Sequence, residues 1–600
     1  MRTLCCLSLL AVTLGVAQEP TADQQPATEQ QPAANQPSVA PAAALASIRG
    51  VVRNAATGEP LPRALVRIEG DADTGALTDG QGRFEIPGVA VGPQIIRVRK
   101  PGFHDRPYAT EEPDNQSDGP AHSVLVAAEM AELNFTLTPT SAIHGHIELS
   151  TGDPAQGITL TLLKQVIRNG RSLWTQSGDT QTNGEGAYRF AGLREGVYAL
   201  FTRPALESEP AVTVVAAGAK VVRQGYSSIF FPDAREFADA ARIRLPAGQQ
   251  AEANLLLTLE PFYTVTATAI MPSGKPYGGN RSEGFFSRGS LGPVIVLDAS
   301  GRRLAYTGQF DSTTNTFQAN LPDGTYSLAV NVVSSEANTS GSGRTAGKTS
   351  QEAASFSGFA EFSVEGHAVL NLRIPLLPLP SWTIHLRTLR TALQPVQTTS
   401  NTGQRTETKV TVSAMEGGDV STDGALVDAS GEDAGPDLLE LEGVSSGHYW
   451  LSTEVNDRSL CVDSFTAGGI NLAREPLNVG LGASPPPMEL MLRDDCAKLA
   501  LSLPPMLAAF LPGDEPFYTV YVVPDFDTTA DIPPMNIHPS SGATVTVDGL
   551  TPGSYHIYTF DHPVRLEYRN PAVLAALPTP GQAVTLSAGT TGNLMLEVPQ

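Results

Sequence analysis

The 600-residue sequence predicts an all-β protein of tandem β-sandwich domains, preceded by an export signal and a disordered spacer. A short turn–strand–turn segment recurs along the chain, and its apolar and polar residues alternate as in a half-buried strand. The chain has 56 glycines and 47 prolines, which supply the many turns that short strands need. Helical periodicity is almost absent, and only residues 233–241 are expected to make one or two helical turns.

The N-terminus has the parts of a secretory signal, which we expect to span residues 1–17. Arg2 gives the positive charge, residues 4–14 form the apolar stretch, and a small-x-small motif ends at Ala17, after which we expect cleavage. Residues 18–46 consist mostly of Pro, Gln, Ala and Thr. They bury too little apolar surface to fold, so we expect them to be a disordered spacer.

The recurring segment is clearest at residues 182–198, TNGEGAYRFAGLREGVY. Asn183 and the glycine after it provide the positive φ angles of a tight hairpin turn. Tyr188 and Phe190 then alternate with smaller or charged residues, so one face of the strand is apolar. A second turn at Gly196 leads into the next strand.

Five copies of this segment place their second turn glycine between 104 and 128 residues apart. This period corresponds to one domain per repeat, because solenoid repeats are only about 20–50 residues long. The glycines are Gly92, Gly196, Gly324, Gly447 and Gly553. We therefore expect five β-sandwiches, at residues 47–139, 140–260, 261–377, 378–493 and 494–600.

The predicted sandwiches follow one another closely. Four of them end in a strand that starts with asparagine, and a proline follows the first three of these strands within a few residues. Such joints limit bending, so we expect an extended rod. Two polar segments, residues 334–357 and 398–437, are expected to be loops.

Two of the four cysteines, Cys5 and Cys6, lie inside the signal sequence. Removal of the signal leaves Cys461 and Cys496. An even pair in an exported chain predicts a disulfide bond. The alternative is two independent buried thiols.

The net charge of −23 argues against a nucleic-acid partner and against docking on anionic lipid, because both require clusters of Lys and Arg. After the signal, no apolar run is long enough to span a bilayer. We therefore expect an exported protein without a membrane span, located in the periplasm, on the outer cell surface or outside the cell.

A shared set of residues links the first two predicted sandwiches: Gly50, 78–84 and Gly92 in the first copy, and Gly145, 182–188 and 196–198 in the second. On these residues the two sandwiches resemble carboxypeptidase regulatory-like domains. The resemblance implies a transthyretin-like (prealbumin-like) or immunoglobulin-like sandwich, classed near carbohydrate-binding (starch-binding) and Cna B-type folds. Predicted sandwiches three to five resemble the family only in the turn and the final strand.

The whole layout resembles large exported bacterial proteins built from such domains. Residues 462–472 and 566–571 resemble recurrent strands of those proteins. In metallocarboxypeptidases the regulatory-like domain is an accessory to a separate catalytic domain. The resemblance therefore implies neither a peptidase activity nor a cofactor.

Two groups of residues have spacings that a metal site can use, and each has a simpler explanation. His144, His146 and Glu148 alternate on one face of a strand, which is also what an ordinary outward face looks like. The aspartates between residues 71 and 79 lie near a turn, where aspartate usually caps the backbone and only rarely binds calcium. Nucleophile motifs are lacking, so we assign no metal site and no catalytic residue.

Two tryptophans are the candidate ligand-binding residues. Trp450 follows a tyrosine that recurs in four copies, so it faces outward if that tyrosine faces the core. Trp174 lies in a polar hairpin of the second sandwich. An exposed indole ring stacks on a sugar or on a partner protein. The alternative is a contact with a neighbouring module or loop.

The sequence thus predicts an exported, non-catalytic protein with a structural or adhesive role at the bacterial envelope. Its partner would be an envelope protein or polysaccharide. An array of carbohydrate-binding modules is the first alternative. An accessory subunit of an exported peptidase is the second, and it rests only on the family resemblance.

Overall fold

The computed structural model describes nineteen stretches of the chain. These are residues 45–70, 74–104, 121–127, 132–207, 223–277, 294–298, 303–307, 309–311, 314–334, 354–379, 382–391, 410–416, 427–429, 438–441, 447–480, 483–504, 518–537, 544–562 and 564–598. The predicted signal peptide and almost all of the predicted spacer lie outside them.

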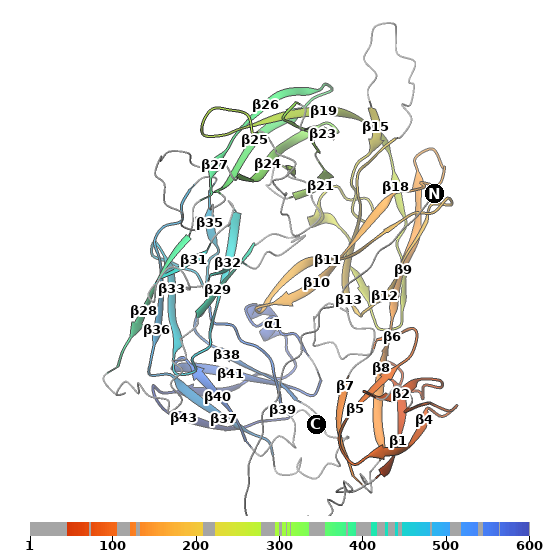
Figure 1. Cartoon of the computed structure of the whole chain (residues 1–600), viewed down its shortest axis with the longest axis vertical. Coiled ribbons are helices and arrows are strands. Elements are labelled where there is room, and N and C mark those ends of the chain that lie inside the picture. The colour runs from red at the N-terminus through yellow and green to blue at the C-terminus, as the bar shows by residue number, and fades with distance from the viewer. Residues whose placement is uncertain are drawn as a thin grey trace, which may run out of the picture. The chain divides into compact units, whose positions relative to one another are not determined.

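The first sandwich consists of two four-stranded sheets that face each other (Figure 1). One sheet has the order β4-β1-β8-β6 and the other β3-β2-β5-β7. The strands are β1 (Leu45–Asn54), β2 (Leu65–Ile68), β3 (Gly75–Leu77), β4 (Arg83–Ala90), β5 (Gly92–Arg99), β6 (Phe103–His104), β7 (Ala121–Val126) and β8 (Leu133–Pro139).

The second sandwich has one sheet of order β11-β10-β13-β16 and one built around β9, with β12 on one side and β17 and β18 on the other. A short 3-10 helix, η1 (Phe237–Asp239), lies within the segment expected to be helical. The strands are β9 (Ser141–Leu149), β10 (Thr159–Arg168), β11 (Arg171–Gln181), β12 (Ala187–Leu193), β13 (Gly196–Thr202), β16 (Ile243–Leu245), β17 (Gln250–Glu252) and β18 (Leu255–Leu257).

The third sandwich shares a sheet with the preceding part of the chain. Its first strand, β19, pairs with β15, which comes from the region predicted to belong to the second sandwich. The sheets are β14-β15-β19-β23-β22, with β26 also on β19, and β21-β20-β24-β25-β27. The strands are β14 (Ala205–Leu206), β15 (Arg223–Tyr226), β19 (Leu259–Ile270), β20 (Val294–Asp298), β21 (Arg303–Thr307), β22 (Gln309–Asp311), β23 (Thr316–Leu321), β24 (Gly324–Ser334), β25 (Ala354–Val364), β26 (Val369–Pro375) and β27 (Leu377–Pro378).

The fourth sandwich has sheets of order β31-β28-β36-β33-β34 and β30-β29-β32-β35. Its strands β29 and β30 lie inside residues 398–437, so the prediction of a loop throughout that segment is wrong. The strands are β28 (Trp382–Leu389), β29 (Val410–Glu416), β30 (Val427–Ala429), β31 (Leu438–Leu441), β32 (Gly447–Val455), β33 (Cys461–Ala467), β34 (Ile470–Asn471), β35 (Leu477–Val479) and β36 (Met488–Arg493).

The fifth sandwich has sheets of order β40-β37-β43 and β39-β38-β41-β42. It also contains a one-turn helix that the sequence did not predict, α1 (Pro571–Ala575), which Asn570 caps through its side chain. The strands are β37 (Ala497–Ser502), β38 (Tyr518–Pro524), β39 (Met535–Ile537), β40 (Thr544–Leu550), β41 (Gly553–Phe560), β42 (Gln582–Leu586) and β43 (Thr591–Met595).

One connection pattern is common to all five sandwiches. The first strand of each pairs antiparallel with the strand that precedes the turn glycine, and parallel with a strand near the end of the sandwich. The antiparallel pairs are β1–β4, β9–β12, β19–β23, β28–β31 and β37–β40. The parallel pairs are β1–β8, β9–β18, β19–β26, β28–β36 and β37–β43.

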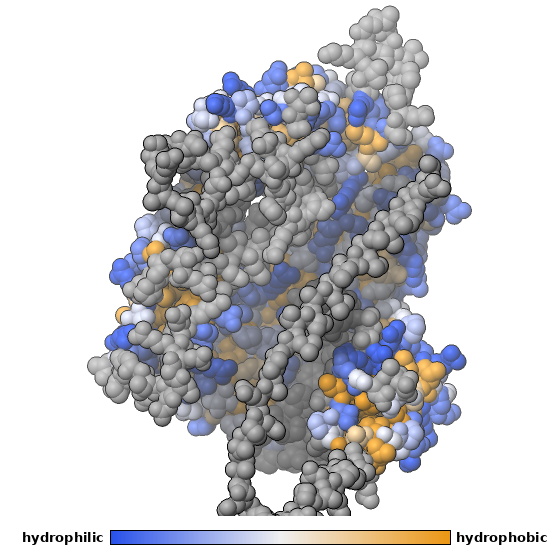
Figure 2. Space-filling model, viewed as in Figure 1, coloured by the Kyte–Doolittle hydropathy of each residue, from blue (hydrophilic) through white to orange (hydrophobic). Residues whose placement is uncertain are grey.

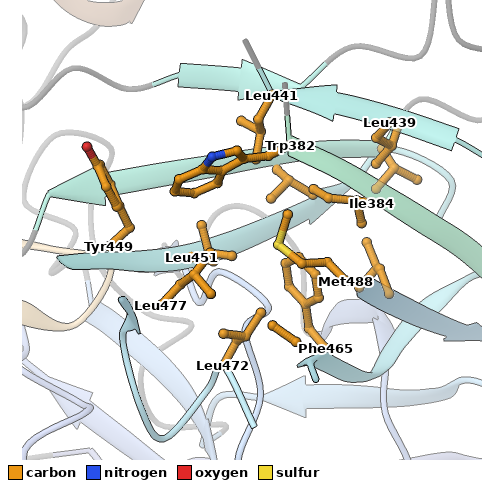
Figure 3. Close-up of a cluster of buried hydrophobic side chains, with 14 of the residues drawn as sticks. Trp382, Ile384, Leu439, Leu441, Tyr449, Leu451, Phe465, Leu472, Leu477 and Met488 are labelled. Carbon is orange, nitrogen blue, oxygen red and sulfur yellow. The ribbon is translucent and has the colours of Figure 1, made fainter. Parts of the chain in front are cut away.

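Each sandwich buries its own apolar cluster between its two sheets. Figure 3 shows the cluster of the fourth sandwich, in which Trp382 is fully buried and packs edge-on against Tyr449, at 5.2 Å between ring centroids. The alternation of apolar and polar residues in β28 and β32 places these rings on the inner faces. The precise boundaries of the five domains stay a prediction.

The first turn of the recurring segment is held by side chains of the motif itself. The Thr78 hydroxyl donates to the Leu61 carbonyl at 2.5 Å and accepts from the Ala64 amide at 2.8 Å. Asp79 Oδ1 accepts two backbone N–H groups at 2.8 Å each. In the second sandwich Thr182 and Asn183 make the same contacts, so this aspartate or asparagine is a turn residue.

The recurring tyrosine after the second turn has a structural role. The Tyr198 hydroxyl donates to the Arg194 carbonyl at 2.6 Å, and Tyr326 donates to the Pro322 carbonyl at 3.2 Å. Tyr555 reaches the carbonyl four residues before it in the same way. Each ring is buried, so its hydroxyl needs this partner.

Candidate functional site

Trp174, the first candidate, is buried within the second sandwich. It lies on β11, is only 8% exposed, and contacts Phe237 of η1 edge-on at 5.4 Å. The Arg242 guanidinium lies 4.7 Å from the centre of the indole ring. The segment that contains η1 covers the outer face of this sheet, so the Trp174 ring is buried beneath that segment and lies outside the core between the two sheets.

Trp450, the second candidate, points away from the core of the fourth sandwich, as its position after Tyr449 predicts. Tyr449 is 5% exposed and belongs to the inner cluster, whereas Trp450 is half-buried. The Arg171 guanidinium carbon lies 3.3 Å from the centre of the Trp450 ring. A cation on the ring face is a favourable arrangement, and here it covers that face.

Arg171 belongs to the tip of the β10–β11 hairpin of the second sandwich. Asn169 and Gly170 form the turn, with φ angles of 47° and 70°. Two successive residues with positive φ are typical of the tight turn that joins antiparallel strands, and Asn-Gly is its preferred sequence. The last paired residues, Arg168 and Arg171, flank this turn directly.

The hairpin tip binds the fourth sandwich through two further polar contacts. The Asn169 side-chain amide donates to the Ser452 hydroxyl at 2.9 Å. Arg171 donates to the Ala473 carbonyl at 3.3 Å. Ser452 is two residues after Trp450 on β32, so one outward row of that strand receives the tip.

The tip also binds the fifth sandwich, through Arg569. The Arg569 backbone amide donates to the Gly170 carbonyl at 3.1 Å, and its guanidinium donates to the Asn169 carbonyl at 2.9 Å. The same guanidinium donates to the carbonyls of Thr528 and Ala530, at 2.6 and 3.0 Å. Arg569 therefore ties the hairpin backbone to a loop of its own sandwich.

Tyr568 forms the floor of this site. It is 7% exposed, and its hydroxyl donates to Asp531 at 3.2 Å. Its ring lies directly beneath Gly170, where a Cβ atom would fall 2.5 Å from the ring carbons. Burial raises the pKa of the Tyr568 phenol, which keeps it a neutral hydrogen-bond donor.

We call residues 450, 452, 473, 568 and 569 the socket. It is a partly dehydrated environment for a cation. Burial, the largest cause, and the neighbouring Arg569 cation together lower the pKa of Arg171 to about 10. Its guanidinium still carries its charge at neutral pH, where the indole face and a carbonyl oxygen receive it.

The two sandwiches that form the socket are tied to each other. Cys461 and Cys496 form a disulfide bond, which confirms the predicted pairing. The Thr453 amide donates to the Thr529 carbonyl at 2.9 Å, so a loop of the fifth sandwich extends the edge of β32. Thr551 adds a hydrogen bond of 2.7 Å to the Val462 carbonyl.

These contacts contradict the expectation of an extended rod, because the second sandwich touches the fourth and the fifth. Residues 45–600 accordingly cluster as one unit. Two segments singled out in the sequence, residues 462–472 and 566–571, border or build the socket. Residues 462–472 contain most of β33 and all of β34, but the expectation of a strand at residues 566–571 is wrong, because this segment contains a turn that leads into α1. Nothing in the sequence indicated that an Asn-Gly hairpin binds at the socket.

The remaining sequence candidates do not form a cluster of ligands. His144 is half-buried, and His146 and Glu148 are exposed along the outward face of β9. Asp79 caps its own turn, while residues 71–73 lie outside the described stretches. Within those stretches no group of three or more His, Cys, Asp or Glu residues is arranged to hold a metal ion.

The helices in the described part of the chain are too short or too polar to cross a bilayer.

A comparison with known protein families finds a match in the first sandwich. The model of the family described as carboxypeptidase regulatory-like domain matches residues 47–138. Residues 47–138 are thus similar to domains of that family, in line with the resemblance of the first predicted sandwich. The comparison with curated proteins finds no match.

Solved structures similar to the chain include several bacterial proteins. The Bacillus anthracis TIE protein is 9% identical with a TM-score of 0.13, over 75% of this chain and 69% of that one. A streptococcal ancillary pilin is 11% identical with a TM-score of 0.15, over 55% and 98%. Two B repeats of the Staphylococcus aureus collagen-binding protein are 12% identical with a TM-score of 0.14, over 70% and 93%. At these values the similarity establishes no function for the chain.

Proposed function

We propose that the chain is an exported, non-catalytic β-sandwich protein with a structural or adhesive role at the cell envelope. The disulfide bond between Cys461 and Cys496 carries this proposal. Such bonds persist in oxidising compartments outside the cytosol, and this one secures the region where two sandwiches meet. The recurring motif residues support a non-catalytic role, because their side chains stabilise turns or pack in the cores. The outer surfaces of the sandwiches therefore stay available for binding.

The outer face of the β3-β2-β5-β7 sheet supports an adhesive role. Leu77 and Ile95 lie on this face and are 56% and 41% exposed. On the view in Figure 2, orange apolar residues gather over the first sandwich beside blue polar ones. Arg67, Arg97 and Arg99 share this face with the two apolar side chains. A protein partner can contact apolar and charged side chains together, so an envelope protein is the partner that we propose.

The carbohydrate-binding alternative depends on Trp174 and Trp450. The first is buried, and the second already has Arg171 on its ring face. A sugar would have to displace that guanidinium before it stacked on Trp450. No contact in the described residues favours the peptidase-accessory alternative.

A capture experiment with the immobilised full chain tests the proposal. Leu77→Ser removes an apolar side chain from the proposed surface, and Leu256→Ser is a matched control because Leu256 is 57% exposed on the second sandwich. We expect one envelope protein to be retained by the wild type and by the control, and lost with Leu77→Ser. Retention that a soluble glycan abolishes would favour the carbohydrate alternative, and equal retention by all three chains would contradict the proposed surface.

A further inference from the structure

The β10–β11 hairpin is longer than its own sandwich requires. β10 pairs with β13 only from Leu160 to Lys164, whereas its pairing with β11 continues to Arg168. Within the described residues, the corresponding strands of the first sandwich, β2 and β3, are four and three residues long. The outer half of the hairpin therefore projects beyond the sheet that anchors it.

The projecting tip is matched to its socket in shape. The Tyr568 ring occupies the space that a side chain at residue 170 would need, so glycine alone allows this approach. The turn also presents its backbone carbonyls outward, and Arg569 binds two of them, at Asn169 and Gly170. Recognition of backbone carbonyls requires the turn geometry itself, which is a stricter condition than a contact between side chains.

The match extends to charge and hydrogen bonding. The Asn169 side-chain amide donates a hydrogen bond to the Ser452 hydroxyl, and the Arg171 cation lies on the face of the Trp450 ring. Arg569 brings a second cation close to Arg171, which is unfavourable by itself. The three carbonyls that its guanidinium binds offset this repulsion, at Asn169, Thr528 and Ala530.

The socket exists only where the fourth and fifth sandwiches meet. Trp450, Ser452 and Ala473 come from the fourth, and Tyr568 and Arg569 from the fifth. The Cys461–Cys496 bond and the Thr453–Thr529 pairing hold these parts together. A tip that binds both sandwiches at once adds a further connection between them.

We propose that this socket is a specific receptor for an Asn-Gly-Arg hairpin tip, and that the chain's own residues 169–171 occupy it as a latch. The latch fastens the second sandwich to the joint between the fourth and fifth, and it covers the aromatic face of Trp450. When the tip leaves, Trp450 and the Tyr568 ring become accessible. This inference is independent of the envelope partner proposed above, because it concerns only contacts within the chain.

The test compares two glycine substitutions in the full chain. Gly170→Ala places a methyl group against the Tyr568 ring, at a φ of 70°. Gly192→Ala is the matched control, because it has a φ of 71° in the same sandwich and open space around its Cβ position. Both variants carry the same backbone strain, so a difference between them reports the socket.

Two readouts follow the latch. The chain has three tryptophans, so incorporation of 5-fluorotryptophan gives three ¹⁹F resonances, of which Trp450 reports the socket. Hydrogen exchange of the Arg569 amide reports its bond to the Gly170 carbonyl. In Gly170→Ala we expect a shifted Trp450 resonance and roughly tenfold or faster exchange at Arg569, with neither change in Gly192→Ala. Unchanged Trp174 and Trp382 resonances show that the second and fourth sandwiches are folded.

Two further variants test the same contacts if Gly170→Ala fails to fold. Arg171→Gln removes the cation from Trp450, and we expect the Trp450 resonance to move while Trp174 does not. Asn169→Cys with Ser452→Cys is expected to cross-link on oxidation within one chain. A Trp450 resonance that no variant moves would overturn the latch. A cross-link found only between two copies would overturn the assignment of the occupant to the same chain.

Discussion

Removal of the disulfide bond should lower the free energy of unfolding of the fourth sandwich by an amount that depends on the length of the loop that the bond closes. The bond joins residues 35 positions apart, Cys461 at the start of β33 and Cys496 just after β36. In the chain-entropy model a loop of this size restricts the unfolded chain by about 4 kcal/mol at 25 °C. The Cys461→Ala/Cys496→Ala variant should therefore lose about 4 kcal/mol in the free energy of unfolding of this sandwich.

Trp382 gives a local measure of that loss, because it lies fully buried in the same core. A sandwich of this size has a urea dependence of about 2 kcal/mol per molar, so the midpoint should fall by about 2 M in urea. The ¹⁹F resonance of Trp382 follows the transition, and that of Trp174 in the second sandwich should keep its midpoint. A fall of less than about 0.5 M would refute the reasoning, since it would mean that the bond scarcely restricts the unfolded chain.

Three other predictions concern individual side chains. Gly145→Ala should destabilise the second sandwich by about 3 kcal/mol, because a Cβ atom there collides with the Ala253 carbonyl oxygen. Gly157→Ala is its control: this residue has a positive φ but open space around its Cβ position, so the substitution should cost only about 1 kcal/mol. Urea unfolding followed by the Trp174 signal measures both losses, and an equal loss in the two variants would contradict the collision at residue 145. Tyr198→Phe should cost about 1 kcal/mol, because it removes the hydroxyl donor to the Arg194 carbonyl, and an unchanged midpoint would show that water replaces this bond. Burial raises the pKa of Tyr188, so the unfolded chain loses this proton first and stability should fall as pH rises above about 10. A Tyr188→Phe variant should lose less stability over this pH range than the wild type, and an equal loss in both would contradict the reasoning.

The repeated parts of the fold could be predicted because local chemistry determines them. The Asn183 turn, the alternation of Tyr188 and Phe190 and the glycine turns each depend on residues close in sequence. The fourth sandwich was harder to delimit, because its strands β29 and β30 lie in a polar stretch whose apolar residues are few. Helix α1 depends on a single turn capped by Asn570, which is too short to give a periodic signal.

Of the candidate site, the sequence predicted only the features that depend on neighbouring residues. The outward direction of Trp450 follows from its neighbour Tyr449, and the structure agrees. What covers Trp450 does not follow, because Arg171 is nearly three hundred positions away and no periodicity links the two. Trp174 appeared exposed because its hairpin is polar, yet the distant segment around Phe237 closes over it. Contacts between sandwiches depend on complementary surfaces, which a pattern along one strand does not encode.

The thiol state and location of the native chain test the proposed function most directly. Cells that make the full sequence are fractionated, and the chain is alkylated before and after reduction. The proposal predicts a chain in the exported fraction that begins after Ala17 and whose Cys461 and Cys496 react only after reduction. A chain that stays in the cytosol with both thiols reactive from the start would contradict an exported envelope scaffold.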